Sequence, residues 1–359
     1  FRHGHHSDKA YDSVILHVVS EADTEITRTN GEQIPQLLLT CPENVRLHYH
    51  ELCVADQYPA CHPILASLPK LTIHSWLTAL QTERLEQKAR LITQRLALCN
   101  RNWEDAFFIT LARNFGFGLN GDAFETWAGL LPFRALDKHR NDLFQIEAFF
   151  YGLAGLLEET FLKKEQEDEY SLRLCKEFRY LQRKFEIGQG MDATLWRFLR
   201  LRPENFPHIR LAQLAYLYQK GDKLFSRLLE AETLADVRTL LDARTSPYWE
   251  NHYLFGRPSS QKEKTMGERS KDLIIINTVV PFLYTYGLHK TDERMCERAG
   301  RFLEELKAES NHIIRSWSDA GLPVVSAADS QALIQLQKEY CDKRKCLYCR
   351  FGYEYLRKK

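Results

Sequence analysis

The N-terminal part of the chain has the hydrophobic pattern of short β-strands. The β-branched run Val14–Val19 lacks clean alternation, which is typical of a strand covered on both faces. Two extended runs follow, Glu25–Thr29 and Glu32–Leu39, and the Asn30-Gly31 pair between them predicts a hairpin because both turn residues must take positive φ. Three strands are too few for a stable sheet. The pattern therefore predicts a β-rich remnant over residues 1–41 whose partner strands lie upstream of this chain.

Helical periodicity begins at about Pro42 and continues nearly to the C-terminus. In the stretch Thr72–Cys99, apolar residues recur at i, i+3 and i+4 spacing between charged ones. The fold class is therefore α+β and predominantly α-helical, with a helical domain over 42–340 and a C-terminal module over 341–359. Residues 255–271 are rich in Gly, Pro, Ser and Lys, which predicts a flexible linker. Further helices are predicted at about 103–115, 122–131, 141–158, 170–185, 191–201, 207–219, 232–243, 270–288, 292–309 and 329–341.

Charge and cysteine content narrow the range of partners and compartments. With 49 Lys and Arg against 48 Asp and Glu, the chain has no overall field to attract nucleic acid or an anionic membrane, so such a partner would need a local patch. The least polar stretch, Leu273–Leu288, is shorter than the ~20 residues that cross a bilayer and predicts a buried helix. Nine cysteines without a regular framework, and no secretory signal pattern, predict a reducing, cytoplasmic location without a membrane partner.

The chain starts abruptly. It opens Phe1-Arg2-His3-Gly4-His5-His6, without an initiator Met and directly before a strand, which predicts an N-terminally truncated fragment. Together with Asp8 and Asp12, these histidines form a dense set of potential metal ligands, although ordering a chain end costs entropy. His5 and Asp8 are the candidate catalytic residues of this segment, in a position that would lie between two core strands if upstream strands exist.

The C-terminus carries the sharpest chemical signal, the motif Cys341-x4-Cys346-x2-Cys349. A Cys-x2-Cys pair can hold one metal ion from a tight turn, and a third thiolate nearby can close on the same ion. Zinc and an iron–sulfur cluster both use such spacings. A closed site needs a fourth ligand, for which Cys296 or His312 are candidates. The alternative is three ordinary thiols at the end of a helix in a reducing cell.

The same segment is basic and aromatic. Between Lys343 and Lys359 there are seven Lys or Arg against one Glu, interleaved with four aromatic residues. Cations neutralise phosphates and aromatic rings stack on bases, so this segment could contact DNA or RNA, with Lys345 and Arg350 as anion-binding candidates. A solvated, charged tail is the alternative.

Two internal arginine and glycine patterns have both a functional and a structural interpretation. Four arginines surround a turn that is fixed by two prolines: Arg197, Arg200, Arg202 and Arg210. They could bind a phosphate or carboxylate, or form salt bridges between helices.

The glycine motif Gly116-x-Gly118-x-x-Gly121 has the spacing of a dinucleotide-binding fingerprint, but the residues before it have a helical pattern. A helix–turn–helix corner is therefore predicted.

Glu147 lies in a segment that is apolar almost all round. An unpaired carboxylate in such surroundings has a raised pKa and could act in acid–base chemistry. Pairing with an arginine of the group above would instead make it structural.

Several stretches carry a resemblance over essentially the whole chain: His3-Gly4-His5 with Asp8–Val19, Asn114–Asn120, Gly152–Leu157, Arg200–Pro207, and Tyr340-Cys341 through Cys349. With them the chain resembles an uncharacterised bacterial family known only as a domain of unknown function. Members of that family begin earlier, with Gly-Pro-Asp-Phe and Val-Glu-Ile-His motifs. An Asp followed by Glu-x-His on adjacent strands is similar to metal-dependent nucleases, in which carboxylates hold Mg²⁺ for phosphodiester hydrolysis. The resemblance implies that this chain lacks those carboxylates and is inactive as it stands.

Two functions of different classes follow. The first is a nucleic-acid-processing or nucleic-acid-binding protein related to metal-dependent nucleases. The second is a non-enzymatic helical interaction or scaffold protein with structural cysteines, which needs only amphipathic helices. Binding of DNA or RNA at low salt distinguishes the two.

Overall fold

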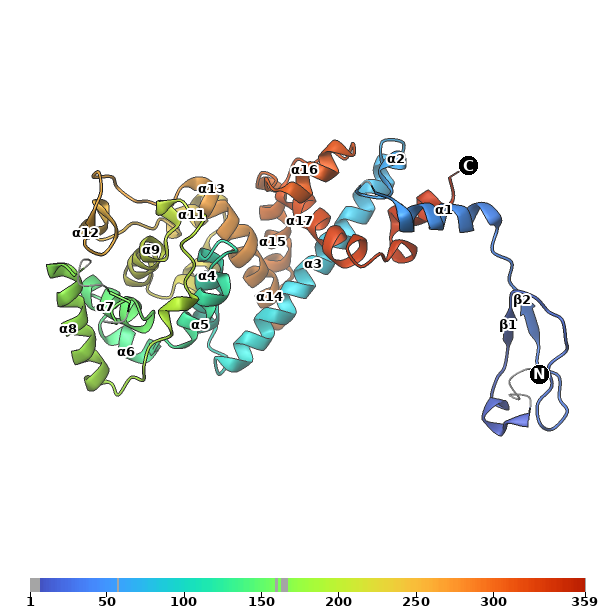
Figure 1. The fold of residues 1–359 in the computed structure, drawn as a ribbon, viewed down its shortest axis with the longest axis horizontal. Helices are drawn as coiled ribbons and strands as arrows, with labels where there is room; N and C mark the ends of the chain where they lie inside the picture. Colours follow the sequence, from blue (N-terminus) through green and yellow to red (C-terminus); the bar gives the residue numbers. More distant parts are fainter. Residues whose placement is uncertain (1–6, 57, 159–160, 163–166, 359) are drawn as a thin grey trace. The chain divides into compact units, whose positions relative to one another are not determined.

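The computed structural model describes residues 7–56, 58–158, 161–162 and 167–358, and these residues are predominantly helical with a few short strands (Figure 1). The predicted α+β, mainly helical class is confirmed. None of the described helices combines the length and apolarity needed to span a bilayer. The chain divides into two compact units. Unit 1 comprises Phe1–Trp76, Asn311–Pro323 and Ile334–Lys359, and unit 2 comprises Leu77–Ser310 and Val324–Leu333.

The boundaries of the two units do not fall at residues 41 and 340, where the composition placed them. The C-terminal segment belongs to the same unit as the N-terminal segment. This arrangement follows from contacts between residues about 300 positions apart, which local composition does not encode. The stretch 255–271, expected to be a flexible linker, holds the buried residues Phe255, Lys264 and Met266.

The N-terminal strands of unit 1 form a two-stranded sheet. β1 (His17–Val19) pairs in parallel with β2 (Gln36–Leu38). The predicted turn at Asn30-Gly31 is present between them, with Gly31 at a φ of +84° and the Arg28 N–H donating to the Glu32 carbonyl at 2.8 Å. Val18 is 50% exposed and Leu38 53% exposed. The expectation of a strand covered on both faces is therefore wrong for the described residues, which contain no second layer over this sheet.

The remainder of unit 1 is helical. Its C-terminal helix contacts both of the first two helices. The Tyr355 hydroxyl donates to Glu51 at 3.0 Å, the Lys358 ammonium pairs with the same carboxylate at 2.7 Å, and His48 Nδ1 lies 3.1 Å from the Leu356 carbonyl. The elements are α1 (Glu43–Val54), α2 (His62–Leu65), the first turns of α3 (Lys70–Leu98), α16 (His312–Asp319), a π-helical segment (Leu336–Cys341), a 3₁₀ turn (Cys346–Tyr348) and α18 (Arg350–Leu356).

Unit 2 is built around a large aromatic core. Trp127, Phe149 and Phe150 are fully buried, and α7 contacts both α8 and α9 (Figure 1). Its elements are the rest of α3, α4 (Trp103–Phe115), α5 (Gly121–Gly129), α6 (Phe133–Lys138), α7 (Leu143–Leu153), α8 (Glu169–Lys184), α9 (Pro207–Lys220), α10 (Leu224–Glu230), α11 (Leu234–Leu240), α12 (Pro247–Glu250), β3 (His252–Leu254), β4 (Arg257–Pro258), α13 (Glu268–Ile274), a π-helical segment (Ile275–Val279), α14 (Val280–Lys290), α15 (Glu293–Glu305) and most of α17 (Ala327–Gln335).

The glycine motif forms the predicted corner between two helices. Helix α4 ends at Phe115 and α5 begins at Gly121, with Gly118 at a φ of +90° between them. A Cβ on Gly116 would lie 2.4 Å from the Gly121 nitrogen. The glycines thus permit a tight turn between helices, and the motif does not follow a strand as a dinucleotide fingerprint requires.

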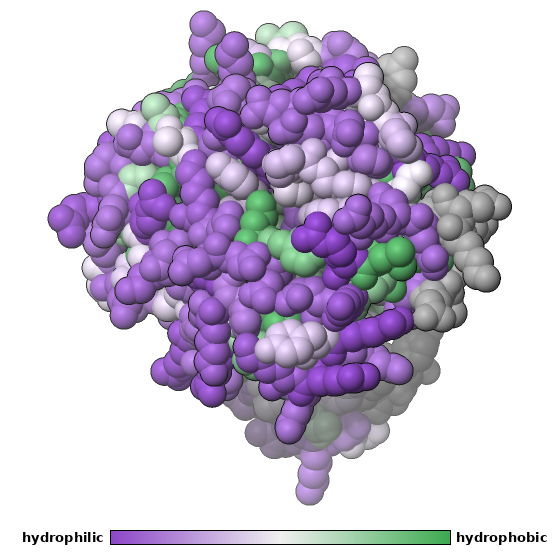
Figure 2. Space-filling view, turned by 90° about the vertical axis from the view of Figure 1, so that its left-hand side faces the viewer, coloured by the Kyte–Doolittle hydropathy of each residue, from purple (hydrophilic) through white to green (hydrophobic). Residues whose placement is uncertain are grey.

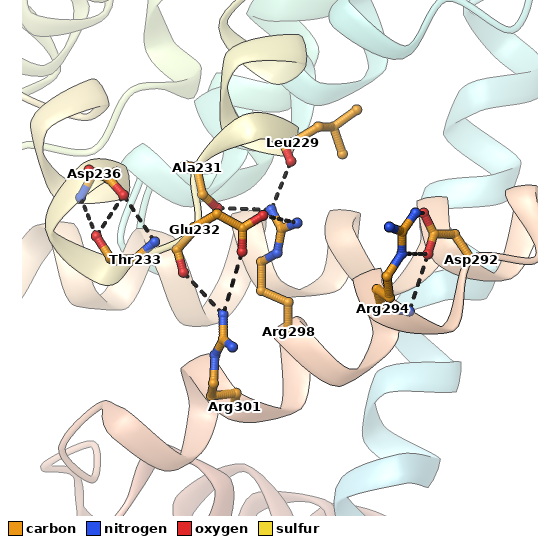
Figure 3. A network of polar contacts seen from close by, with 9 residues as sticks. All are labelled: Leu229, Ala231, Glu232, Thr233, Asp236, Asp292, Arg294, Arg298 and Arg301. Atoms are coloured by element: carbon orange, nitrogen blue, oxygen red, sulfur yellow. Dashed lines mark hydrogen bonds and ion pairs between the residues drawn. The ribbon is translucent and has the colours of Figure 1, made fainter.

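A buried arginine on α15 holds the connection between α10 and α11 (Figure 3). The Arg298 guanidinium donates to the Leu229 carbonyl at 2.7 Å, to the Ala231 carbonyl at 2.9 Å and to Glu232 at 2.8 Å. Arg298 is 7% exposed, and these carbonyls lie at the C-terminal end of α10, where no further helical N–H groups can satisfy them. Arg301 adds a hydrogen bond to the Glu232 carbonyl at 3.1 Å, so Arg298 contributes most of the contacts that hold this loop and Arg301 supports it.

Replacement of Arg298 by alanine should lower the free energy of unfolding of unit 2 by about 2–3 kcal/mol, because several charge-assisted hydrogen bonds are lost. Arg294→Ala on the same helix is the matched control. The Arg294 side chain is 85% exposed and pairs with Asp292 two positions away, so its loss should cost under about 0.5 kcal/mol. Urea unfolding followed by circular dichroism measures both. Equal losses from the two substitutions would show that the α10–α11 connection does not depend on Arg298.

Candidate functional sites

A cavity of about 130 Å³ in unit 1 is lined by five cysteines. The sequence motif contributes Cys341, Cys346 and Cys349, and the N-terminal segment contributes Cys53 and Cys61. Cys53 belongs to the last turn of α1, and Cys61 lies directly before α2. All nine cysteines of the chain are free thiols. The structure thus concentrates more than half of them around one small space.

The local backbone explains how three cysteines within nine positions face one cavity. Cys341 is the last residue of the π-helical segment, and the chain then turns through Arg344, which has a φ of +50°. The Lys345 N–H donates to the Tyr340 carbonyl at 2.7 Å and closes this turn. A 3₁₀ turn then carries Cys346, and Cys349 follows at the start of α18.

Burial dominates the electrostatics of the thiols. It raises the pKa of Cys61 well above the ordinary thiol value, and neighbouring Cys349, Cys341 and Cys346 raise it further. Burial also raises the pKa of Cys349, while the N–H groups of Gly352 and Phe351 favour its thiolate form. Without a positive partner these thiols are protonated at neutral pH.

His312, one of the two candidates for a fourth ligand, does not line this cavity. Cys296 belongs to unit 2, on α15, where its thiol faces the Tyr284 carbonyl at 3.6 Å. His312 lines a different surface hollow, beside Tyr58 and His62. The residue that joins the motif is Cys61, 280 positions before Cys341 in the sequence. Sequence spacing gave no signal for it, because only the tertiary contact of the two chain segments brings it there.

The same part of the chain contains no preformed ligand set for one ion. Within the described ranges, no three His, Cys, Asp or Glu side chains are grouped closely enough to hold a metal ion. The five thiols line the wall of the cavity.

Most cations of the C-terminal segment have partners within unit 1. Arg344 donates to the Cys53 carbonyl at 2.9 Å, Arg350 donates to the Ser75 hydroxyl at 2.7 Å, and Lys343 pairs with Glu339. Lys345 is exposed. The basic residues of the segment therefore hold it against its own unit. Of the two predicted anion-binding residues, Arg350 has a described hydrogen bond and Lys345 has none among the described residues.

The arginines around the proline turn do not converge on a common point. Arg200 and Arg202 are exposed, whereas Arg210 is buried. Arg210 donates to Gln213 at 2.8 Å and Asn205 at 2.5 Å and stacks on the Phe117 ring at 4.4 Å. Burial lowers its pKa to about 10. The hydrogen-bond partners of Arg210 are thus side-chain amides. An anion-binding group or an interhelical salt bridge would each have required an anionic partner.

Glu147 is fully buried within unit 2. Its Oε2 accepts a short hydrogen bond from the Tyr170 hydroxyl, and its Oε1 has no hydrogen-bond partner within the described part of the chain. Burial raises the pKa of Glu147 to about 7. Tyr170 in turn stacks on Tyr248, with ring centroids 4.1 Å apart. The partner is therefore a tyrosine instead of an arginine.

The N-terminal candidates form no described site. His5 lies outside the described residues. Asp8 accepts a hydrogen bond from the Ala10 N–H and caps a short 3₁₀ helix. Asp12 accepts from the Thr29 N–H and hydroxyl and so supports the turn between β1 and β2.

Helix α8 carries a basic face that none of the sequence motifs indicated. Helix α8 carries five Lys or Arg against two Glu, and all five cations are exposed. At 3.6 residues per turn they lie within about 140° of the helix circumference. We call this set the basic face of α8: Arg173, Lys176, Arg179, Arg183 and Lys184. The helix itself was predicted at 170–185, so a helical projection of that stretch would have found the face.

The surroundings of α8 are hydrophilic. Figure 2 shows that the side of unit 2 carrying α8 and α12 is mostly hydrophilic, with small apolar patches separated from one another. Tyr180 lies among the cations of the basic face and is 54% exposed. Lys138 of α6 approaches the end of the face, over the Phe185 ring at 5.8 Å.

Comparison with known proteins identifies the family and nothing more specific. The chain belongs to the family described as Protein of unknown function (DUF2851), whose model matches residues 1–312. No curated protein and no solved structure matches the chain. The predicted membership of an uncharacterised family is thereby confirmed.

Proposed function

We propose that this protein binds nucleic acid through the basic face of α8. The observation that carries the proposal is the set of five exposed cations on one face of a single helix. Neutralisation of backbone phosphates by Lys and Arg supplies most of the affinity in sequence-independent binding. Because the whole chain is nearly neutral, such a local patch is what binding requires.

The shape and chemistry of the face suit an extended polyanion. From Arg173 to Lys184 the helix rises about 17 Å, which corresponds to about five base pairs of duplex. The exposed ring of Tyr180 offers a surface on which an unpaired base could stack. Arg173 is already oriented by the Phe144 ring, 5.1 Å from its guanidinium carbon.

The relation to metal-dependent nucleases remains part of the proposal. It rests on the resemblance of the N-terminal segment, which contains β1. Binding through the basic face of α8 does not depend on cleavage, so incubation of the purified chain with labelled nucleic acid and Mg²⁺ tests the relation to nucleases separately. Cleavage would support that relation, and either outcome would leave the binding proposal standing.

The triple substitution Lys176→Gln, Arg179→Gln and Arg183→Gln should weaken binding of single- and double-stranded DNA and RNA by about tenfold or more at low salt. Loss of three phosphate contacts should also reduce the slope of log K against log salt by about 2–3. Fluorescence anisotropy with labelled oligonucleotides over a salt series measures both.

The control is the triple substitution Arg269→Gln, Lys290→Gln and Lys307→Gln, which removes the same charge from exposed positions elsewhere in unit 2. It should change affinity by less than about twofold if binding is local to α8. Equal effects of the two triples, or no binding by the unsubstituted chain at low salt, would refute the proposal. In the second case the scaffold function becomes the better account.

A further inference from the structure

We propose that Cys61 and the three motif cysteines together bind one thiophilic metal centre, either a zinc ion or an iron–sulfur cluster. The observation is independent of the nucleic-acid proposal and concerns unit 1 alone. Four thiolates are the number that a closed zinc site and a cubane iron–sulfur cluster both require. The tertiary structure supplies the fourth from the other end of the unit.

The choice of Cys61 over Cys53 follows from their burial. Both line the cavity with the three motif cysteines, but Cys61 is buried whereas Cys53 is only partly buried. A closed structural metal site keeps its ligands from solvent, so Cys61 is the better fourth ligand.

The room between the thiols favours a cluster of several atoms over a single ion. With zinc–sulfur bonds of about 2.3 Å, four tetrahedral thiolates lie about 4 Å from one another. Among the described residues no three such side chains already form a ligand set, so either metal centre requires the thiols to rearrange around the cavity of about 130 Å³. A cluster takes one thiolate at each of four corners and occupies more of that space than a single zinc ion does.

Other residues around the cavity can stabilise the negative charge that bound thiolates would carry. Four thiols lose their protons on binding, which leaves anionic sulfur in a largely buried site. Arg344 lines the same cavity, and its positive charge offsets part of the negative charge of such a centre. The buried indole nitrogen of Trp76 has no hydrogen-bond partner among the described residues, so it is available to donate to a thiolate.

The centre would join distant parts of the chain. Cys61 precedes α2, and the motif lies between the π-helical segment and α18. A metal shared between them closes a loop of 280 residues. The cofactor would therefore act as a structural link that holds the C-terminal segment on the N-terminal one.

The first test uses the unsubstituted chain, purified without oxygen and reconstituted with either zinc or with iron and sulfide. Metal and sulfide are quantified, and absorption spectra are recorded. The loaded chain is then alkylated and the modified cysteines are mapped by mass spectrometry. We expect Cys61 and the motif cysteines to be protected at least tenfold relative to the same chain stripped with a chelator, with the exposed Cys41 reacting equally in both.

The second test compares Cys61→Ser with two matched controls, Cys53→Ser and Cys296→Ser. The first should lower bound metal at least tenfold, and the controls should retain it. Because Cys61 is buried, circular dichroism establishes whether the variant is folded, and the alkylation map of the unsubstituted chain decides the question if it is not.

Each outcome is decisive for part of the proposal. Iron with stoichiometric sulfide and a broad visible absorption band would support the cluster, and one zinc per chain without colour would support the four-thiolate centre but overturn the cluster. Protection of Cys53 in place of Cys61 would overturn the ligand assignment. Absence of both metals after reconstitution, or disulfide bonds among the four cysteines in the anaerobic chain, would overturn the centre itself.

Discussion

Substitution of Gly352 by alanine should destabilise unit 1 by about 3 kcal/mol or more, because the added methyl group has no room. A Cβ at this position would lie 2.1 Å from the Cys346 carbonyl oxygen and 2.9 Å from its carbonyl carbon. Both atoms are backbone, so no side-chain rotation relieves the overlap. The 3₁₀ turn of Cys346 and the start of α18 would have to separate, which disrupts the spacing of Cys346 and Cys349.

Gly300→Ala provides a control of the same chemistry. Gly300 lies within α15, and nothing is found within 4 Å of its added Cβ. Alanine should therefore stabilise unit 2 by up to about 1 kcal/mol through its better helix propensity. Thermal melting and limited proteolysis, with the released fragments mapped to each unit, measure the two effects. Equal melting behaviour of Gly352→Ala and the unsubstituted chain would show that α18 can leave the Cys346 turn without cost.

The Gly352 result does not depend on the metal proposal. The steric overlap involves only backbone atoms of this chain, so the loss of stability is expected with or without a bound metal. If a metal centre is present, Gly352→Ala should in addition lower its occupancy, because two of the ligands lie on either side of the displaced turn. If Gly352→Ala lowers stability but leaves the amount of bound metal unchanged, the displaced turn does not affect metal binding by Cys346 and Cys349.

Glu147→Gln should make unit 2 more stable at alkaline pH and change its stability little at pH 4.5. Burial raises the pKa of Glu147 to about 7, from the ordinary value of 4.5. Between these values the folded chain keeps the proton and the unfolded chain has lost it, so the free energy of unfolding falls as pH rises through this window. The shift corresponds to about 3 kcal/mol, which is present below pH 4.5 and lost by about pH 7.

The neutral amide removes this titration and keeps an acceptor for the Tyr170 hydroxyl. The variant should therefore lack the decline between pH 4.5 and 7 and exceed the unsubstituted chain by up to about 3 kcal/mol at pH 8. Glu304→Gln, at an exposed position of α15, should reproduce the unsubstituted profile. Urea unfolding at a series of pH values measures all three chains. Parallel profiles for Glu147→Gln and the unsubstituted chain would show that this carboxyl titrates normally.

The prediction also bears on a catalytic role for Glu147. A carboxyl that titrates near neutrality is suited to acid–base chemistry, but its described partner is the Tyr170 hydroxyl inside the helical core. The pH dependence of stability follows from burial alone. A gain in stability on neutralisation would show that the ionised carboxyl of Glu147 lowers the stability of unit 2, as expected of a buried acid–base group.

Local sequence patterns determined much of the architecture of this protein. Helical periodicity predicted the dominant class, and the glycine spacing with its helical flanks predicted the α4–α5 corner at Gly116 and Gly121. Asn30-Gly31 predicted its turn. Such features succeed because the backbone conformation they require is set by the residues themselves, within one or two turns of chain.

The tertiary structure decided which distant residues meet. Periodicity states which face of a helix is apolar but not which element covers it. The partner of the cysteine motif therefore could not be found from spacing, and neither Cys296 nor His312 lines the cavity that Cys61 shares with it. For the same reason the buried Arg298 and the Tyr170 partner of Glu147 were not predicted.

The sequence by itself determined a predominantly helical chain of a family of unknown function, with a cysteine motif suited to a metal. Only the tertiary structure joined that motif to Cys61, and only it showed that the basic face of α8, which helical periodicity defines, is exposed. Ligand sets and binding faces depend on distances across space, which arise when separate apolar faces pack together. Those distances are set by how the core packs, whereas the sequence pattern shows only which residues can take part in the packing.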